Sequence, residues 1–267
     1  MNTESPIPMF YTKTGSGPAI VLVNGFPASG SLWRCVVDDL AGSFLVIVPD
    51  LPGSGRSPLT RKMSLGDMAD GIRDILDAER IDTVVLAGHS MGGYIALEFA
   101  ARYPGRLAGL TLIHTTPAAD DEDRKNARLK SIDIIADGGK RLLVSQLVSG
   151  LFSPSFKQSH SVIVEQQIDL SLSMPDRCLI NFYEAMIQRN DHRTLLKSVS
   201  CPVQWVIGTD DNVIFYKKII EFCYQSGINF VTFIKNCGHM SMLEAPSTLV
   251  ADLMEFINYC FHIDNQE

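Results

Sequence analysis

Short runs of apolar residues recur along the chain, separated by stretches long enough for helices. The runs are rich in β-branched residues and lack polar residues at every second position, which is typical of strands buried on both faces of a parallel sheet. They span Ala19–Val23, Phe44–Val48, Thr83–Ala87, Gly109–Ile113, Val203–Ile207 and Phe230–Ile234. This pattern predicts an α/β fold with a mostly parallel central sheet and helices on both faces.

The start of the chain has a different pattern. Met9–Lys13 and Ala19–Val23 flank a stretch of turn-forming residues, Thr14-Gly15-Ser16-Gly17-Pro18. Two strands joined by such a short, glycine-rich connection commonly pair as a hairpin. We therefore expect an antiparallel hairpin at the leading edge of the sheet.

The strand pattern stops between Thr115 and Lys197 and resumes at Val203. Helical spacing replaces it, and the segment opens with the charged cluster Asp120–Lys125, which we expect to be the solvated start of a helix with acids at its positive end. Because the segment begins where a strand ends, we interpret residues 115–197 as a helical cap. Residues 1–114 and 198–267 then form the α/β core.

Composition and charge narrow the class of protein. The chain has 267 residues, of which 46% are hydrophobic and 20% charged, as in an ordinary globular protein of one large domain or one domain with an insertion. The net charge of −7 argues against a phosphate-binding surface, so we expect no nucleic-acid partner. No apolar run approaches the roughly 20 residues that a membrane span needs, so we expect no membrane partner.

The six cysteines form no C-x-x-C pair and no close Cys/His pair of the kind that binds zinc. The first residues show no basic patch followed by an apolar stretch, as a secretory signal would. We therefore expect free thiols in a cytoplasmic protein, with no metal and no organic cofactor. The oligomeric state is not predicted by these patterns.

The residues that follow the strands carry the chemistry, because ligands of open parallel sheets bind at the carboxyl ends of the strands. Thr83–Ala87 is followed by Gly88-His89-Ser90-Met91-Gly92-Gly93 and then by a helical stretch, Tyr94–Tyr103. This is the G-x-S-x-G pattern in its expected context, a sharp strand-to-helix turn that exposes a serine hydroxyl. The flanking glycines are needed because side chains there would collide with neighbouring backbone. Ser90 is the predicted nucleophile.

A serine nucleophile needs a base, and the base needs an orienting acid. His239 follows Phe230–Ile234, and the neighbouring Asp210 and Asp211 follow Val203–Ile207. The chain order Ser, Asp, His is that of α/β-hydrolases, so we predict a triad of Ser90, Asp211 and His239, with Asp210 as the competing acid. An acid after the preceding strand is disfavoured, since no carboxylate follows that strand before Asp120.

These motifs together resemble the α/β-hydrolase superfamily, and within it the small, cap-bearing, esterase-like members. The blocks that carry the resemblance are Val21–Pro27, Pro49–Ser57, Gly88–Gly93, Gly208–Asp211 and Gly238–Met240 with Glu244–Pro246. The resemblance implies Asp211, three residues past Gly208, as the acid. It also implies an oxyanion hole formed by the backbone N–H groups of Phe26 and Met91. The sequence departs from the family at Asn24, where the family usually has a histidine that supports the loop and is not the catalytic base. We expect the asparagine to keep a hydrogen-bonding role.

Several further residues are candidates for binding the substrate. They are Asn24, His89, Phe152, Met186 and Met240. Apolar residues of the cap, including Phe152 and Met186, suggest a small apolar substrate. The same residues could equally serve only to pack the cap on the core, since an amphipathic helix needs a buried face.

The predicted reaction is hydrolysis of a carboxylic ester or related acyl bond of a small molecule through an acyl-enzyme. Carbon–carbon bond hydrolysis, lactone opening, perhydrolysis and acyl transfer use the same constellation and stay open, because fold does not choose among them. A different class is also open: a small-molecule receptor on the same fold with little turnover.

Overall fold

A seven-stranded sheet forms the centre of the computed structural model, which describes residues 8–262. The order of the strands is β1-β3-β2-β4-β5-β6-β7. Five neighbouring pairs, from β3–β2 to β6–β7, are parallel, and β1 runs antiparallel to β3. The strands are β1 (Tyr11–Thr14), β2 (Ala19–Val23), β3 (Leu45–Pro49), β4 (Val84–His89), β5 (Leu107–Ile113), β6 (Val203–Gly208) and β7 (Asn229–Ile234). The predicted mostly parallel sheet is confirmed.

The central strands are mostly apolar because both of their faces are covered. Every residue of β2, β4 and β6 is buried, whereas the edge strand β7 is mostly half-buried. The predicted strands agree with the observed ones to within one or two residues at each end, which is the usual uncertainty of strand ends read from sequence.

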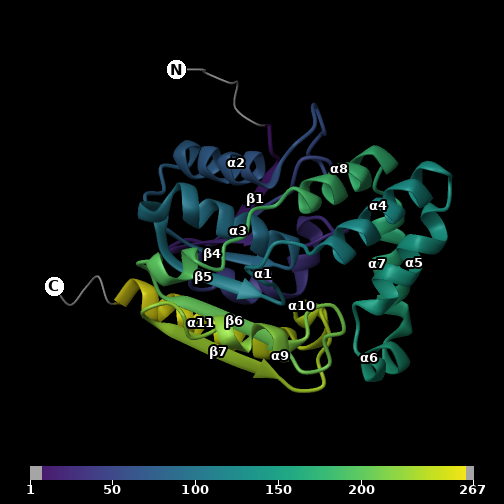
Figure 1. The fold of residues 1–267 in the computed structure, drawn as a ribbon. Coiled ribbons are helices and arrows are strands. Elements are labelled where there is room, and N and C mark those ends of the chain that lie inside the picture. Colours follow the sequence, from purple (N-terminus) through teal and green to yellow (C-terminus); the bar gives the residue numbers. More distant parts are fainter. Residues whose placement is uncertain (1–7, 263–267) are drawn as a thin grey trace.

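Helices cover the sheet on two faces and extend beyond one end of it (Figure 1). α2 and α3 pack on each other, with α3 on the sheet, while α1 and α11 pack together on the strands. Figure 1 shows α4–α7 gathered on the side toward which β7 points. Within residues 8–262 no helix combines the length and apolar character needed to cross a membrane. The helices are α1 (Arg34–Ala41), α2 (Leu65–Ala78), α3 (Met91–Arg102), α4 (Glu122–Ala136), α5 (Lys140–Gly150), α6 (Pro154–Ser159), α7 (Ser161–Leu172), α8 (Asp176–Ile187), α9 (Tyr216–Ile219), α10 (Ser241–Glu244) and α11 (Pro246–His262).

The predicted hairpin at the start of the chain is wrong in its pairing. β1 is antiparallel and lies at the edge, as expected, but its partner is β3, with Tyr11 opposite Pro49. β2 is already flanked by parallel neighbours on both sides, β3 and β4. The turn residues after β1 therefore carry the chain across β3 instead of folding it back on β1.

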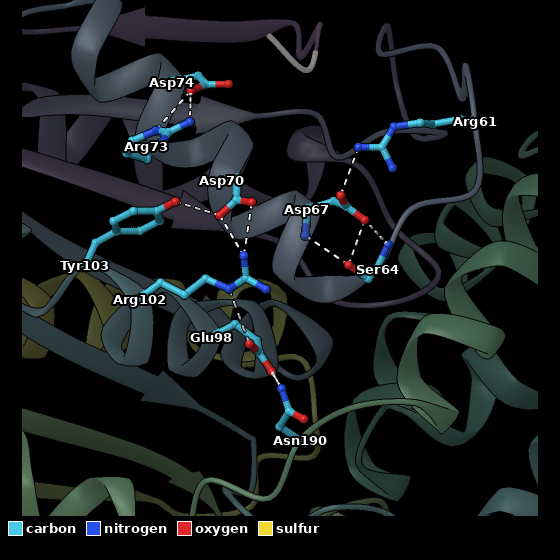
Figure 2. A network of polar contacts seen from close by, with 10 residues as sticks. All are labelled: Arg61, Ser64, Asp67, Asp70, Arg73, Asp74, Glu98, Arg102, Tyr103 and Asn190. Atoms are coloured by element: carbon cyan, nitrogen blue, oxygen red, sulfur yellow. Dashed lines mark hydrogen bonds and ion pairs between the residues drawn. The ribbon is translucent and has the colours of Figure 1, made fainter. Parts of the chain in front are cut away.

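A polar network fastens α2 to α3 on the outside of the fold (Figure 2). α2 begins with a capping box in which the side chains of Ser64 and Asp67 each accept from the other's backbone N–H. Arg102 of α3 donates to the carboxylate of Asp70 on α2 at 3.0 Å. Asn190, which follows α8, donates to Glu98 of α3 at 2.8 Å. The network thus also holds the end of residues 115–197, the predicted cap segment, against α3.

The five helices α4–α8 all lie within the segment 115–197 that the sequence assigns to a cap. The division of the chain into cap and core stays a prediction. α4 starts as expected, with Asp121 as its N-cap and Glu122 and Asp123 exposed in its first turn. The expectation that the whole cluster is solvated is wrong for Asp120, whose side chain is inaccessible and paired with Arg128 at 2.6 Å. Sequence position alone did not distinguish this carboxylate from its neighbours.

Candidate active site

Ser90 lies at the turn between β4 and α3, at the carboxyl end of the strand. Its backbone has φ 53° and ψ −116°, a positive-φ conformation that non-glycine residues rarely adopt. A Cβ atom at Gly88 would lie 2.3 Å from the carbonyl oxygen of Gly92, and one at Gly92 would lie 2.3 Å from that of Val23. The glycines are therefore required sterically, as the motif predicts, and the turn leaves Ser90 partly accessible.

His239 and Asp211 are brought together from the loops after β7 and β6. Nδ1 of His239 lies 2.8 Å from Oδ2 of Asp211, and both side chains are almost fully inaccessible. The other carboxylate oxygen, Oδ1, accepts from the backbone N–H groups of Val213 and Ile214 at 2.8 and 2.9 Å. Asp210, the alternative acid, has its Oδ1 bonded to Thr209 instead. The geometry therefore pairs His239 with Asp211.

The loop that carries His239 is held by groups from two parts of the chain. The carboxylate of Glu244 accepts from the backbone N–H groups of Gly238 and Met240 at 3.0 and 3.3 Å. The N–H of His239 itself donates to the carbonyl oxygen of Leu151 at 2.7 Å. Because Leu151 follows α5, the cap segment helps to position the predicted base.

His114 was missed as a site residue by the sequence analysis, which searched the end of β5 only for a carboxylate. Its Nδ1 lies 3.2 Å from Oδ2 of Asp211, the same oxygen that faces His239. The Gly208 N–H also points at this nitrogen, at 3.3 Å. Nδ1 cannot accept from Gly208 and donate to Asp211 at the same time. Because a lone pair on Nδ1 would be repelled by the buried carboxylate, we assign the proton to Nδ1, which donates to Asp211 and does not accept from Gly208. Its place after a parallel strand was the signal that could have identified it.

Three buried histidines surround this one carboxylate. The ring centroids of His89 and His239 are 4.9 Å apart, and those of His114 and His239 are 5.5 Å apart. Nε2 of His89 lies 2.8 Å from the carbonyl oxygen of His239. His89 therefore packs behind the predicted base and is tied to its backbone.

The electrostatics follow from burial and from these contacts. Burial by itself would raise the pKa of Asp211, but the charge of His239 and the hydrogen bonds from His114 and His239 hold it well below its ordinary value. Burial, with the charges of His239 and His114, lowers the pKa of His89 well below its ordinary value. Burial also lowers the pKa of His114, against the opposing effect of Asp211. At neutral pH the site thus contains an anionic carboxylate, and His89 and His114 are neutral.

The same three side chains, His114, Asp211 and His239, form a group whose ligand atoms lie within 4.8 Å of one another among the described residues. Two imidazoles and a carboxylate are a donor set that can hold a metal ion. Here both Nδ1 atoms point at one carboxylate oxygen, at distances normal for N–H···O hydrogen bonds. We therefore describe the group as a hydrogen-bonded network.

The two residues predicted as oxyanion donors are both close to the Ser90 turn in the fold. Met91 is the first residue of α3, so its N–H has no acceptor within the helix. Phe26 follows Gly25, which packs so closely on the nucleophile turn that a Cβ atom there would lie 2.9 Å from Cβ of Ser90. Asn24 is buried and donates to the carbonyl oxygens of Gly25 and Ala28 at 3.1 and 2.6 Å, so its side chain holds this loop.

The remaining candidate substrate residues are buried and lie in different surroundings. Met240 and His89 line a small cavity together with Phe26. Met186 on α8 has its sulfur 3.1 Å from Nη1 of Arg128. Phe152 is inaccessible and stacks on Phe156 with ring centroids 5.5 Å apart. The cavity beside Phe26 therefore brings together two of the candidates, and Phe152 is engaged in packing within the cap segment.

Comparison with known proteins places this arrangement in a family. The sequence model of the alpha/beta hydrolase fold matches residues 18–246. An esterase from Thermogutta terrifontis, solved with malate bound, superimposes with a TM-score of 0.90 at 27% identity and covers 94% of this chain and 93% of its own. The 3-oxoadipate enol-lactonase 1 of Acinetobacter baylyi is 25% identical over 248 residues, 91% of this chain and 89% of that protein.

A shorter match connects the chain to an uncharacterised protein of Mycobacterium tuberculosis. The two are 41% identical over 104 residues, which are 39% of this chain and only 30% of the mycobacterial protein. The family match, in contrast, spans most of the chain, from just before β2 to the first residue of α11. The chain therefore belongs to the alpha/beta hydrolase fold family.

Proposed function

We propose that this chain is a hydrolase that cleaves a carboxylic ester of a small molecule through an acyl-enzyme on Ser90. The observation that carries the proposal is the buried 2.8 Å contact between His239 and Asp211, at the same edge of the sheet as the strained serine turn. A serine next to a histidine that is oriented by a carboxylate is the arrangement that activates a hydroxyl for nucleophilic attack.

Each residue has a defined role in the proposed reaction. Oγ of Ser90 attacks the ester carbonyl while His239 takes its proton, and His239 then gives that proton to the departing alcohol. Asp211, kept anionic by its low pKa, stabilises the imidazolium that forms. The N–H groups of Phe26 and Met91 stabilise the oxyanion. Water then attacks the acyl-enzyme with His239 as base, so one water and one ester yield one acid and one alcohol.

Two observations favour an ester over the other acyl bonds. The Thermogutta terrifontis protein, which covers nearly the whole chain, is an esterase. Phe26 also lies against the aromatic rings of Phe182 and Tyr183, at 6.2 and 4.7 Å between centroids, which suits a carbon chain next to the oxyanion donors. Lactone opening is a second candidate, because the Acinetobacter baylyi relative is an enol-lactonase and a lactone is a cyclic ester.

Initial rates with 4-nitrophenyl acetate and butyrate test the proposal. We expect Ser90→Ala to reduce kcat on the order of 10⁴- to 10⁶-fold, as expected when a nucleophile of a triad is lost. The matched control is Ser200→Ala, an exposed serine outside the site, which should behave as the wild type. Unchanged turnover in Ser90→Ala contradicts the proposal. Binding of a small molecule with no Ser90-dependent turnover of any ester would favour the receptor instead.

A further inference from the structure

Two arginines converge on one buried carboxylate between the cap segment and the core. Nε of Arg128 lies 2.6 Å from Oδ2 of Asp120, and Nη2 of Arg189 lies 3.0 Å from Oδ1. The exposed fractions of the three side chains are 0% for Asp120, 3% for Arg189 and 14% for Arg128. We refer to these three residues as the arginine cluster. It contains two positive charges and one negative charge.

Several N–H donors of the arginine cluster have a weak hydrogen-bond acceptor or none within residues 8–262. Nε and Nη2 of Arg128 both donate to Asp120, at 2.6 and 3.4 Å. The partner of its Nη1 within residues 8–262 is the sulfur of Met186, at 3.1 Å, and a thioether is a weak acceptor. Nε and Nη1 of Arg189 have no hydrogen-bond acceptor within residues 8–262, and its guanidinium lies over the ring of Tyr94 at 3.7 Å. A buried charge without a partner is costly, so the cluster has both spare charge and spare N–H donors for an anion.

The arginine cluster is adjacent to the elements that carry the proposed chemistry. Tyr94 lies on α3 four residues after Ser90, which is about one helical turn. Met186 lies on α8, whose Tyr183 contacts Phe26. The cluster is therefore flanked by α3, which follows the predicted nucleophile, and by α8, which packs on Phe26.

A surface cleft gives access to this region. It has a volume of about 460 Å³ and is lined by Arg189 together with Thr116 and Ile214. Its charged lining also includes Arg124 and Lys218, opposed by Asp121 and Asp123. Thr116 follows β5 two residues after His114. Ile214 supplies one of the N–H groups that hold Asp211. Arg189 thus lines the same cleft as Ile214, which belongs to the loop of the predicted acid. It also contacts Tyr94 on α3, the helix that begins after Ser90.

We propose that Arg128 and Arg189 bind a carboxylate of the substrate, so that the preferred esters are hemiesters of short dicarboxylic acids. The inference rests on the proposed ester hydrolysis and specifies its substrate class. The free carboxylate binds at the arginine cluster, and the ester carbonyl lies at Ser90. Hydrolysis consumes one water and releases the alcohol and the dicarboxylate. Guanidinium groups suit this task because they bind carboxylates through two parallel N–H donors.

The cluster also allows a test that separates ligand binding from a purely structural role. Loss of one arginine leaves Asp120 paired with the other, which is a neutral pair and should not expose a lone buried charge. Either arginine can therefore be replaced without a large loss of stability. The two roles are separated by whether the loss of activity depends on the charge of the substrate.

The experiment compares two substrates of matched length, mono-4-nitrophenyl glutarate and 4-nitrophenyl pentanoate. The ratio of their kcat/KM values, anionic over neutral, should favour the glutarate ester in the wild type and fall on the order of 10- to 100-fold in Arg128→Met and Arg189→Met. Lys130→Met is the control, since it removes the same charge from an exposed position of α4 and should leave the ratio unchanged. Equal losses for both substrates, or a wild type without preference for the glutarate ester, overturn the inference.

A binding measurement separates this inference from the proposed function. Glutarate should raise the Tm of Ser90→Ala, which cannot turn over, and should not raise the Tm of Ser90→Ala combined with Arg189→Met. Absence of a shift in Ser90→Ala contradicts the inference, whatever the activity. A glutarate shift that depends on Arg189, without Ser90-dependent turnover of either ester, supports the anion site and contradicts the esterase. If Arg128→Met fails to fold, Arg128→Lys and Arg189→Met carry the comparison.

Discussion

The strand-end loops and the cap segment reach their side-chain arrangements by different means. Ser90, Asp211 and His239 are positioned largely through contacts with backbone groups. A steric turn fixes Ser90, two N–H groups hold Asp211, and the Glu244 carboxylate and the Leu151 carbonyl hold the backbone of the His239 loop. The arginine cluster is positioned by side chains that meet across α4, α8 and the loops beside them. Backbone constraints require particular residues at neighbouring positions, so they can be recognised as sequence motifs. Contacts between side chains that are distant in sequence produce no such motif.

The two regions should also differ in how their residues affect the hydrolysis of different substrates. The strand-end loops carry the groups that the proposed reaction needs for any ester. In the same proposal, the cap segment carries the groups that select a substrate. Changes in the strand-end loops should therefore affect all substrates, and changes in the cap segment should affect some of them.

After the loss of Ser90 itself, the largest effect is expected for Asp211→Asn. An asparagine keeps the shape but loses the charge that faces His239 at 2.8 Å, so we expect kcat to fall on the order of 10³- to 10⁴-fold for every ester tested. The matched control, Asp210→Asn, changes a neighbour that bonds to Thr209 and should cost less than about tenfold, or 1.4 kcal/mol. If the two variants lose the same activity, the assignment of the acid is wrong.

His114 is expected to matter chiefly for stability. His114→Leu removes one donor from the buried Asp211 carboxylate, which should lower the free energy of unfolding in urea by about 1.5–3 kcal/mol. His114→Asn retains an N–H donor and should recover part of that loss. A His114→Leu variant as stable as the wild type would show that the hydrogen bond to Asp211 contributes little.

The pH dependence of the free energy of unfolding tests the effect of the buried histidines on stability. His89 and His114 have lowered pKa values in the folded protein, so below about pH 6.5 the unfolded chain binds protons that the folded protein does not. Stability should therefore fall as the pH drops from 7 to 5. Each histidine contributes a slope of up to about 1.4 kcal/mol per pH unit.

Urea titrations of the wild type and of His114→Asn at several pH values measure this slope. The variant lacks one of the two histidines, so its stability should depend less steeply on pH. Equal slopes for the two proteins would contradict a lowered pKa for His114.

The smallest effect is expected where the cap segment contacts the loop that contains Phe26 and Pro27. Oγ of Ser171 on α7 donates to the carbonyl oxygen of Pro27 at 2.8 Å. Ser171→Ala should cost about 1 kcal/mol of stability and reduce kcat by less than about tenfold, to a similar extent for acetate and butyrate esters. A substrate-dependent change would indicate that this contact selects substrates and does not only hold the loop.

Much of the fold and of the site could be predicted because local rules act there. The apolar runs correspond to buried strands, and the motif around Ser90 requires glycines for steric reasons. The partner of β1 could not be predicted, because pairing with β3 depends on the flanks of β2 being occupied. The burial of Asp120 depends on Arg128 and Arg189, which lie 8 and 69 residues further along the chain. His114 was overlooked because the search at that strand end was for an acid.

Labelling with a fluorophosphonate, followed by peptide mass spectrometry, tests the central claim most directly. The reagent reacts with serines that are activated by a neighbouring base, so we expect a single stoichiometric adduct on the peptide that contains Ser90 and none in Ser90→Ala. Labelling should be strongly slowed in Asp211→Asn and unchanged in Asp210→Asn. An adduct on another residue, or no adduct on a folded wild-type protein that turns over esters, would contradict the assignment of Ser90 as the nucleophile.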